Sequence, residues 1–167
     1  NGTMTLDANG NLSYIASSDY EYGDADTIQL TSGTNTVIGG KGGDKITAGS
    51  GTNTVLGDDG EAAFDGGTLT SITSTNSDEG GDDVIKLEDG TNTVIAGDGQ
   101  DEVTIGAGTN IVLGDEGSLT VNADSTTTIK TINGSVGDID TINVGEGDNV
   151  AIGGAAGDEI TVTGELA

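Results

Sequence analysis

The sequence predicts an all-β chain, a parallel β-roll (β-solenoid) made of nine-residue half-turns, with a β-hairpin inserted in each 57-residue repeat. Three observations lead to this fold class. A short motif, Asp or Asn followed two residues later by an apolar residue, recurs every nine residues. The series is interrupted at regular intervals by an insertion of constant length. The chain has 31 glycines, no proline and only 2% aromatic residues, so its core has to be thin and aliphatic.

Two kinds of anchor residue carry the nine-residue period. The Asp anchors are Asp26, Asp44, Asp83, Asp101, Asp140 and Asp158, and the Asn anchors are Asn35, Asn53, Asn92, Asn110 and Asn149. The two kinds alternate, and both interruptions follow an Asn anchor. Equivalent anchors recur with the longer period, as Asp26, Asp83 and Asp140 do. This predicts one continuous roll over residues 1–167 with units starting near residues 1, 58 and 115.

Each nine-residue unit consists of a Gly-rich turn followed by a short β-rich run, as in Gly39–Asp44 leading into Lys45-Ile46-Thr47. Two units make one full turn of the roll, with one strand in each of two facing sheets. Successive turns then stack as parallel strands about 4.8 Å apart. A single turn cannot bury its own apolar face, so stacking is required. The Asp loops are predicted along one edge of the roll and the Asn loops along the other.

The formal net charge of −25 excludes nucleic acid and anionic membranes as partners, because both would repel the chain. High charge with low hydrophobicity is typical of disorder, but the strict periodicity favours a fold whose acids are neutralised by cations. No apolar run is long enough to cross a membrane. The chain has no His and no Cys, and its Asp residues form a uniform row. We therefore expect no enzymatic activity.

The stretch Gly39-Gly40-Lys41-Gly42-Gly43-Asp44-Lys45-Ile46-Thr47 matches the nonapeptide G-G-x-G-x-D-x-U-x. Residues 96–104 and 153–161 each depart from it at one consensus position. The chain therefore resembles the RTX, or hemolysin-type calcium-binding, repeat family. The residues directly before Asp26, Asp83 and Asp140 lack the opening Gly pair, so Asp side chains rather than those carbonyls are the predicted ligands there.

The resemblance implies Ca²⁺ between adjacent loops of the Asp edge, which places sites between the loops of Asp26 and Asp44, Asp83 and Asp101, and Asp140 and Asp158. Ca²⁺ takes six to eight oxygens from carboxylates and carbonyls. The predicted ligands are Asp24, Asp26, Gly40, Gly42, Asp44, Asp82, Asp83, Asp98, Asp101, Asp138, Asp140 and Asp158. The alternative is a solvated acidic edge without ions, in which carboxylates about 5 Å apart would repel one another.

The Asn edge is predicted to bind Ca²⁺ weakly or not at all, because Asn carries no charge. We expect a ladder in which the Asn amides bond to the backbone of neighbouring turns. Similar rolls carry Thr and Asn rows that bind ice, and such a row is the alternative use of this edge. It would contain Thr34, Thr52, Thr91 and Thr109.

The insertions, at about 1–23, 58–80 and 115–137, are predicted to be β-hairpins that turn near residues 8–10, 65–67 and 122–124. Ile15, Ile72 and Ile129 hold equivalent positions in the longer period, whereas Met4 and Leu6 are one residue out of phase with their counterparts. Because a lone hairpin is marginal in water, the hairpins should pack on the roll or on one another. They serve either as spacers that stiffen a rod or as lateral contacts with a neighbouring chain.

The resemblance implies a secreted protein, extracellular or on a bacterial surface, that folds when it meets external calcium. It predicts a calcium-stabilised structural module of a stalk, filament, adhesin extender or surface layer. Its partners would be calcium ions and identical chains, joined through hairpins or end to end. The alternative function is an ice- or carbohydrate-binding face on the roll.

Overall fold

The computed structural model describes residues 2–18, 21–75, 80–132 and 137–164. Its seventeen elements are all β-strands. These residues form no helix, and therefore no helix long and apolar enough to cross a membrane. Two of the three sheets are entirely parallel. The prediction of an all-β fold with parallel sheets is confirmed.

The first parallel sheet, here called the Asp sheet, contains the strands that directly follow the Asp anchors. In chain order they are β3 (Thr27–Gln29), β5 (Lys45–Ala48), β9 (Val84–Leu87), β11 (Glu102–Ile105), β15 (Thr141–Val144) and β17 (Glu159–Val162). They lie side by side in this order, and each interruption of the nine-residue series leaves the stacking intact.

The second parallel sheet, the Asn sheet, has an Asn anchor inside each strand. Its strands are β4 (Gly33–Ile38), β6 (Gly51–Leu56), β10 (Gly90–Ile95), β12 (Gly108–Leu113) and β16 (Gly147–Ile152). Their register places Asn beside Asn in every pair. Between the two parallel sheets lies an aliphatic core, of which Ile46, Val55, Ile85 and Val94 are completely buried.

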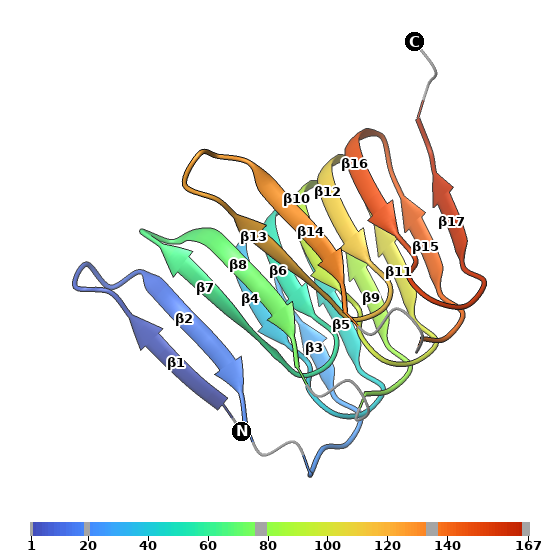
Figure 1. Ribbon diagram of the computed structural model, residues 1–167, viewed down its shortest axis with the longest axis horizontal. Coiled ribbons are helices and arrows are strands. Elements are labelled where there is room, and N and C mark those ends of the chain that lie inside the picture. The colour runs from blue at the N-terminus through green and yellow to red at the C-terminus, as the bar shows by residue number, and fades with distance from the viewer. Residues whose placement is uncertain (1, 19–20, 76–79, 133–136, 165–167) are drawn as a thin grey trace.

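The third sheet, the hairpin sheet, is antiparallel and comes from the insertions. Its strands are β1 (Gly2–Leu6), β2 (Leu12–Ser17), β7 (Gly60–Asp65), β8 (Thr68–Ser74), β13 (Gly117–Val121) and β14 (Thr127–Thr131). The hairpins also pair with one another, β2 with β7 and β8 with β13. Figure 1 shows the hairpin strands side by side in front of the roll strands.

The hairpin sheet covers the Asn sheet, because strand alternation gives the Asn sheet two apolar faces. Val55 points into the roll core, whereas its neighbour Leu56 belongs to a second cluster with Ala62 and Ile72 of the hairpin sheet. The fold therefore has three layers. The first two units each add two strands to every layer, and the third adds two to the Asp and hairpin sheets and one, β16, to the Asn sheet. A full unit therefore lengthens all three sheets equally, by about 10 Å.

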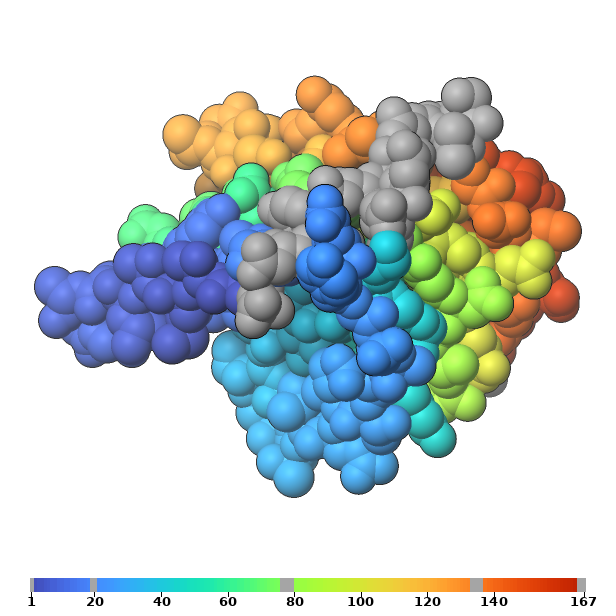
Figure 2. Space-filling model, turned by 90° about the horizontal axis from the view of Figure 1, so that it is seen from below, coloured from blue at the N-terminus to red at the C-terminus, as the bar shows by residue number. Residues whose placement is uncertain are grey.

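The first hairpin is one residue longer than the others. Met4 pairs with Ile15 in the first hairpin, and Ala62 pairs with Ile72 at the equivalent place in the second. The stretch of chain from Met4 to Ile15 is one residue longer than that from Ala62 to Ile72. This extra residue accounts for the phase difference seen in the sequence. The hairpin projects beyond the end of the roll (Figure 2), where Met4 is 64% exposed while Ala62 is 1% exposed.

Candidate metal site

The Asp anchors form a continuous row along one edge, here called the Asp ladder. Through Oδ1, each anchor after the first accepts a hydrogen bond from the backbone N–H of the anchor one turn earlier. The donor–acceptor pairs are Asp26 to Asp44 at 2.7 Å, Asp44 to Asp83 at 2.7 Å, Asp83 to Asp101 at 2.8 Å, Asp101 to Asp140 at 3.0 Å and Asp140 to Asp158 at 3.1 Å. The three predicted ligand pairs are thus parts of one uninterrupted row.

The second carboxylate oxygen, Oδ2, of most ladder anchors lacks the hydrogen-bond partner that a buried polar atom ordinarily has. In Asp44, Asp83, Asp101 and Asp140 the Oδ2 atom is buried and has no hydrogen-bond donor. Each of these side chains is at most 2% exposed. A buried charged oxygen without a partner is strongly unfavourable. The row therefore suits a bound cation, which would supply the missing positive charge.

Burial raises the pKa of these carboxyl groups well above the ordinary Asp value. The pKa is raised to about 6 for Asp44, about 7 for Asp140, about 8 for Asp83 and about 9 for Asp101, with loss of solvent as the main cause. Neighbouring anchors raise it further by charge repulsion, while the backbone hydrogen bonds of the ladder oppose the shift. Without cations, protons would therefore occupy much of the ladder near neutral pH.

The remaining predicted ligands lie in the loops around the ladder. Gly40 and Gly42, in the loop of Asp44, have φ values of 97° and 110°, which favour glycine. Asp24 is exposed, and its backbone lies against Gly42. Asp82 is exposed too, and its Oδ1 accepts the Gln100 amide at 2.9 Å. Asp98 is half-buried, and the remaining two predicted ligands are the exposed Asp138 and the half-buried Asp158.

Carboxylates alone do not complete a calcium site in this arrangement. Within the described ranges, no three acidic side chains converge closely enough to hold a metal ion. Ca²⁺ requires six to eight oxygens, so backbone carbonyls of the loops have to supply the others. This fits the donor set of the nonapeptide loop, which is rich in glycine and leaves its backbone accessible.

Two of the three loops that lack an opening pair next to their anchor, those of Asp83 and Asp140, are complete in space, because the hairpin interrupts the loop instead of preceding it. The Gly40 amide donates to Gly57 O at 3.0 Å and the Asp58 amide to Ala96 O at 3.2 Å. Gly57-Asp58 therefore stacks in the same row as Gly39-Gly40 and Ala96-Gly97. Gly114-Asp115 holds the same position in the third unit, where the Asp115 amide donates to Gly153 O at 3.0 Å.

Asp58 and Asp115 are functional candidates that sequence reasoning missed. Both are buried beside the ladder. Burial and the charge of Asp83 raise the pKa of Asp58 to about 8, and burial also raises the pKa of Asp115. The next residues, Asp59 and Glu116, are buried too. The sequence did contain a signal for Asp58, because Gly57-Asp58 follows Gly39-Gly40 at the spacing of one full turn. The hairpin, however, separates Gly57-Asp58 from the anchor Asp83 along the chain.

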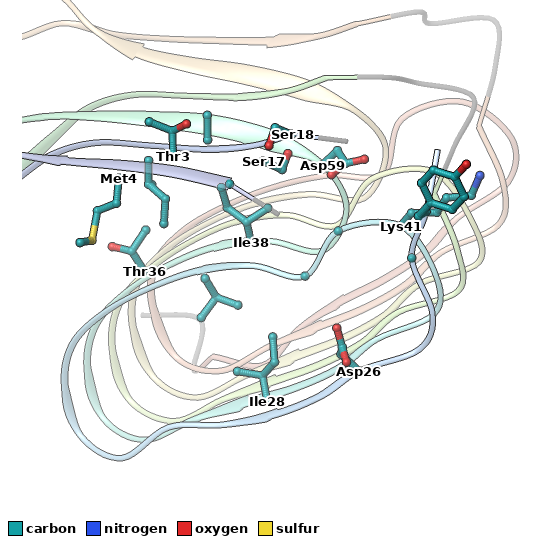
Figure 3. Close-up of a pocket in the computed structure, with 18 of the residues that line it drawn as sticks. Thr3, Met4, Ser17, Ser18, Asp26, Ile28, Thr36, Ile38, Lys41 and Asp59 are labelled. Atoms are coloured by element: carbon teal, nitrogen blue, oxygen red, sulfur yellow. The ribbon is translucent and has the colours of Figure 1, made fainter. Parts of the chain in front are cut away.

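One of these acids, Asp59, lies in a hollow at the open end of the roll. The hollow has a volume of 590 Å³ and is bordered by the first hairpin and by the loops of Asp26 and Gly40. Figure 3 shows Asp59 near Ser17 and Ser18, while Asp26 and Ile28 lie on the other side of the opening. Asp59 Oδ2 is buried without a hydrogen-bond donor, like the ladder oxygens.

The opposite edge carries a row of Asn amides as predicted, but the expected bonding to the backbone of neighbouring turns is wrong. The Nδ2 atoms of the first four, Asn35, Asn53, Asn92 and Asn110, each donate to the Oδ1 of the next Asn at 2.8 Å. Each also donates to the carbonyl four residues earlier in its own turn, as Asn92 does to Glu88 O at 3.2 Å. The backbone bonds are thus made within a turn, and the bonds between turns join side chains.

Comparison with known families agrees with this geometry. The model of the RTX calcium-binding nonapeptide repeat matches the chain in four copies, at residues 30–61, 77–103, 89–118 and 131–162. No curated protein and no solved structure gave a match. The matched stretches cover more than half of the chain and contain five of the six Asp anchors, the exception being Asp26. By its repeats and by the ladder that they build, the chain belongs to the RTX calcium-binding nonapeptide repeat family.

Proposed function

We propose that the chain is a calcium-stabilised structural module of a large secreted or cell-surface protein, such as a stalk, filament, adhesin extender or surface layer. One observation carries the proposal. The Asp ladder contains a row of buried carboxylate oxygens that lack donors. Because the family is a calcium-binding repeat, Ca²⁺ is the cation that these oxygens would take.

The proposed ions lie between neighbouring loops of the Asp edge, at the pairs Asp26 and Asp44, Asp83 and Asp101, and Asp140 and Asp158. The anchors would provide charge through Oδ2, while Gly40, Gly42 and the equivalent loop residues would provide carbonyls. The outer ligands proposed are Asp24, Asp82, Asp98 and Asp138. Bound calcium would neutralise the ladder and join consecutive turns.

A rod-like structural role suits the way in which the layers grow. We propose a solenoid in which each repeat contributes two turns and one hairpin, so that the hairpin sheet stiffens the roll along its length. In repeat structures of this kind stability comes from contacts between neighbours. Identical chains could join such a rod end to end or through the hairpin sheet. Extracellular calcium modules work at about 10⁻⁴–10⁻³ M, which suits a switch between export and folding.

The test is folding against calcium concentration. At pH 8, circular dichroism of the chelator-treated chain should show little β signal, and calcium added to millimolar levels should restore it. Titration calorimetry should then give several bound ions per chain. A chelated chain that keeps its full β signal and melting temperature would overturn the proposal, because the ladder would then be stable without cations.

A second candidate, an ice- or carbohydrate-binding face, draws on the Asn sheet. Thr34, Thr52, Thr91 and Thr109 are exposed and stand in register on adjacent strands. Their Asn partners are not available to a ligand, because the amides of Asn53, Asn92 and Asn110 are buried in the ladder. Thermal hysteresis, or retention on a carbohydrate column, that is lost when the Thr row is replaced would favour this candidate.

A further inference from the structure

We propose that Asp58 and Asp115 are additional calcium ligands, and that they tie the second and third hairpins to the cation-binding edge of the roll. This inference rests on the proposed calcium function. It concerns residues at the second position of the nonapeptide loop, where the loops without a hairpin carry Gly40, Gly97 and Gly154. An acid therefore replaces glycine only where a hairpin leaves the loop.

The Asp115 side chain points into the gap between its own loop and the following one. The Ala155 amide of the following loop donates to its Oδ2. A Cβ added at Gly137 or at Gly154 would collide with the Asp115 carboxylate, so the carboxylate lies tightly between these two segments. The residue is only 2% exposed, and its Oδ1 has no hydrogen-bond donor.

Asp58 repeats this arrangement one unit earlier. Its Oδ2 accepts the Asp98 amide at 2.7 Å, and its Oδ1 accepts the Gly81 amide at 3.2 Å. Cβ atoms at Gly80 and Gly97 would collide with the Asp58 carboxylate, as their equivalents would with Asp115. Two units thus place a buried acid in the same gap with the same neighbours.

The gap already contains the part of the ladder that needs a cation. Asp140 Oδ2, which is buried without a donor, lies against Gly114, the residue directly before Asp115, where an added Cβ would collide with it. Asp83 Oδ2, which also has no donor, lies in the same way against Gly57, the residue directly before Asp58. A carboxylate added beside buried carboxylates increases their repulsion, unless a cation lies among them.

A purely structural role for these two residues makes a different prediction. If Asp115 served only to accept the Ala155 amide, Asn would replace it, since one side-chain oxygen accepts that bond. Asn at position 58 would keep only one of the two amide bonds that Asp58 accepts, so Asp115→Asn is the cleaner test of charge. If the two acids bind a cation, Asn removes the charge that attracts it. Loss of the charge would also free the hairpin base, since β7 and β13 begin two residues after these acids.

The experiment is calcium titration of the whole chain carrying Asp58→Asn and Asp115→Asn together. Calorimetry should show two sites lost or weakened at least tenfold, with the β signal still restored at saturating calcium. The matched control is the double variant Asp65→Asn and Asp148→Asn, which makes the same charge change at exposed positions and should bind like the wild type. Wild-type affinity and ion count in the first variant would overturn the inference.

Two further measurements keep the outcome decisive. If the double variant does not fold with calcium, the single variants Asp58→Asn and Asp115→Asn are titrated instead. Each single variant should weaken one calcium site and leave the other unchanged. Unchanged titrations of both single variants would overturn the inference. A wild-type chain that binds no calcium would instead refute the proposed function, so the two failures can be told apart.

Discussion

The Asp ladder and the Asn ladder occupy opposite edges of the same roll and differ by one functional group. Both rows follow the same turns with the same spacing, and both use Oδ1 to accept a hydrogen bond from the neighbouring turn. The Asn amide also donates, so each rung supplies what the next one needs. The carboxylate cannot donate, and its second oxygen remains without a partner.

The difference shows how one scaffold can combine a permanent edge with a conditional one. The Asn edge completes its hydrogen bonds from within the chain, so it should form whenever the turns stack. The Asp edge remains incomplete until a proton or a cation arrives. Calcium dependence is therefore located on one edge, and the following predictions test that location.

The largest effect is expected from removing calcium. A ligand present at about 100 to 1,000 times its dissociation constant stabilises the folded state by about 3–4 kcal/mol per site, so the loss of three sites, about 9–12 kcal/mol, is comparable to the whole stability of an ordinary domain. Chelation should therefore unfold the roll, as measured by far-ultraviolet circular dichroism. Magnesium at the same concentration serves as the control and should restore much less signal, because it demands octahedral geometry.

The next largest effect should come from placing a carboxylate in the Asn ladder. Asn92→Asp introduces a charge at a fully buried position and removes the donor to Asn110 Oδ1 and Glu88 O. We expect a loss of about 3–5 kcal/mol in unfolding free energy, measured by urea denaturation with saturating calcium. Thr91→Asp is the matched control, since it adds the same charge at an exposed neighbour. Equal losses in the two variants would show that the buried ladder has no special role.

Acid should act in opposite directions on the chain with and without calcium. The folded pKa values of about 6–9 in the ladder exceed the ordinary Asp value of 3.8, so folding takes up protons. This stabilisation is complete below about pH 4 and is lost as pH rises through 6–9. The chelated chain should therefore regain β signal when pH falls from 8 to 5. The calcium-bound chain should bind its ions more weakly over the same change, because protons compete for the carboxylates. Chelated chains with identical spectra at both pH values would contradict this assignment.

The smallest effect is expected at Ala156, which occupies the position of Gly42 in its loop. Ala156 has a φ of 66°, a left-handed conformation that is unfavourable for residues with a Cβ. Ala156→Gly should raise the unfolding free energy by up to about 1 kcal/mol with calcium bound. Ala107→Gly, in the turn before the Asn strand β12, is the control and should give no gain. Thermal melts followed by circular dichroism measure both variants.

Much of the roll could be predicted because its information is local. The alternation of Ile85 and Leu87, and the recurrence of Asp and Asn every nine residues, specify which side chains face the core and which turns stack. The same logic predicted a row of Asn amides. It did not reveal that these amides bond to one another between turns, because that depends on side-chain orientation.

The contacts between the hairpins could not be predicted from the sequence. Their positions follow from the longer period, but the pairing of Ile15 with Ala62 and of Ile72 with Leu119 is a contact between hairpins, not a property of any one of them. The covering of Leu56 and Leu113 by this sheet likewise requires all three layers to be present.

The amino-acid sequence by itself determined the period, the strands and the alternation of acidic and neutral anchors, because each depends on residues within a few positions of one another. Only the tertiary structure decided that a hairpin splits the loop, bringing Asp58 beside Asp98 and Asp115 beside Ala155, although each pair is far apart along the chain. The physical reason is that burial, and with it the need for a cation, arises only when distant loops close around a carboxylate.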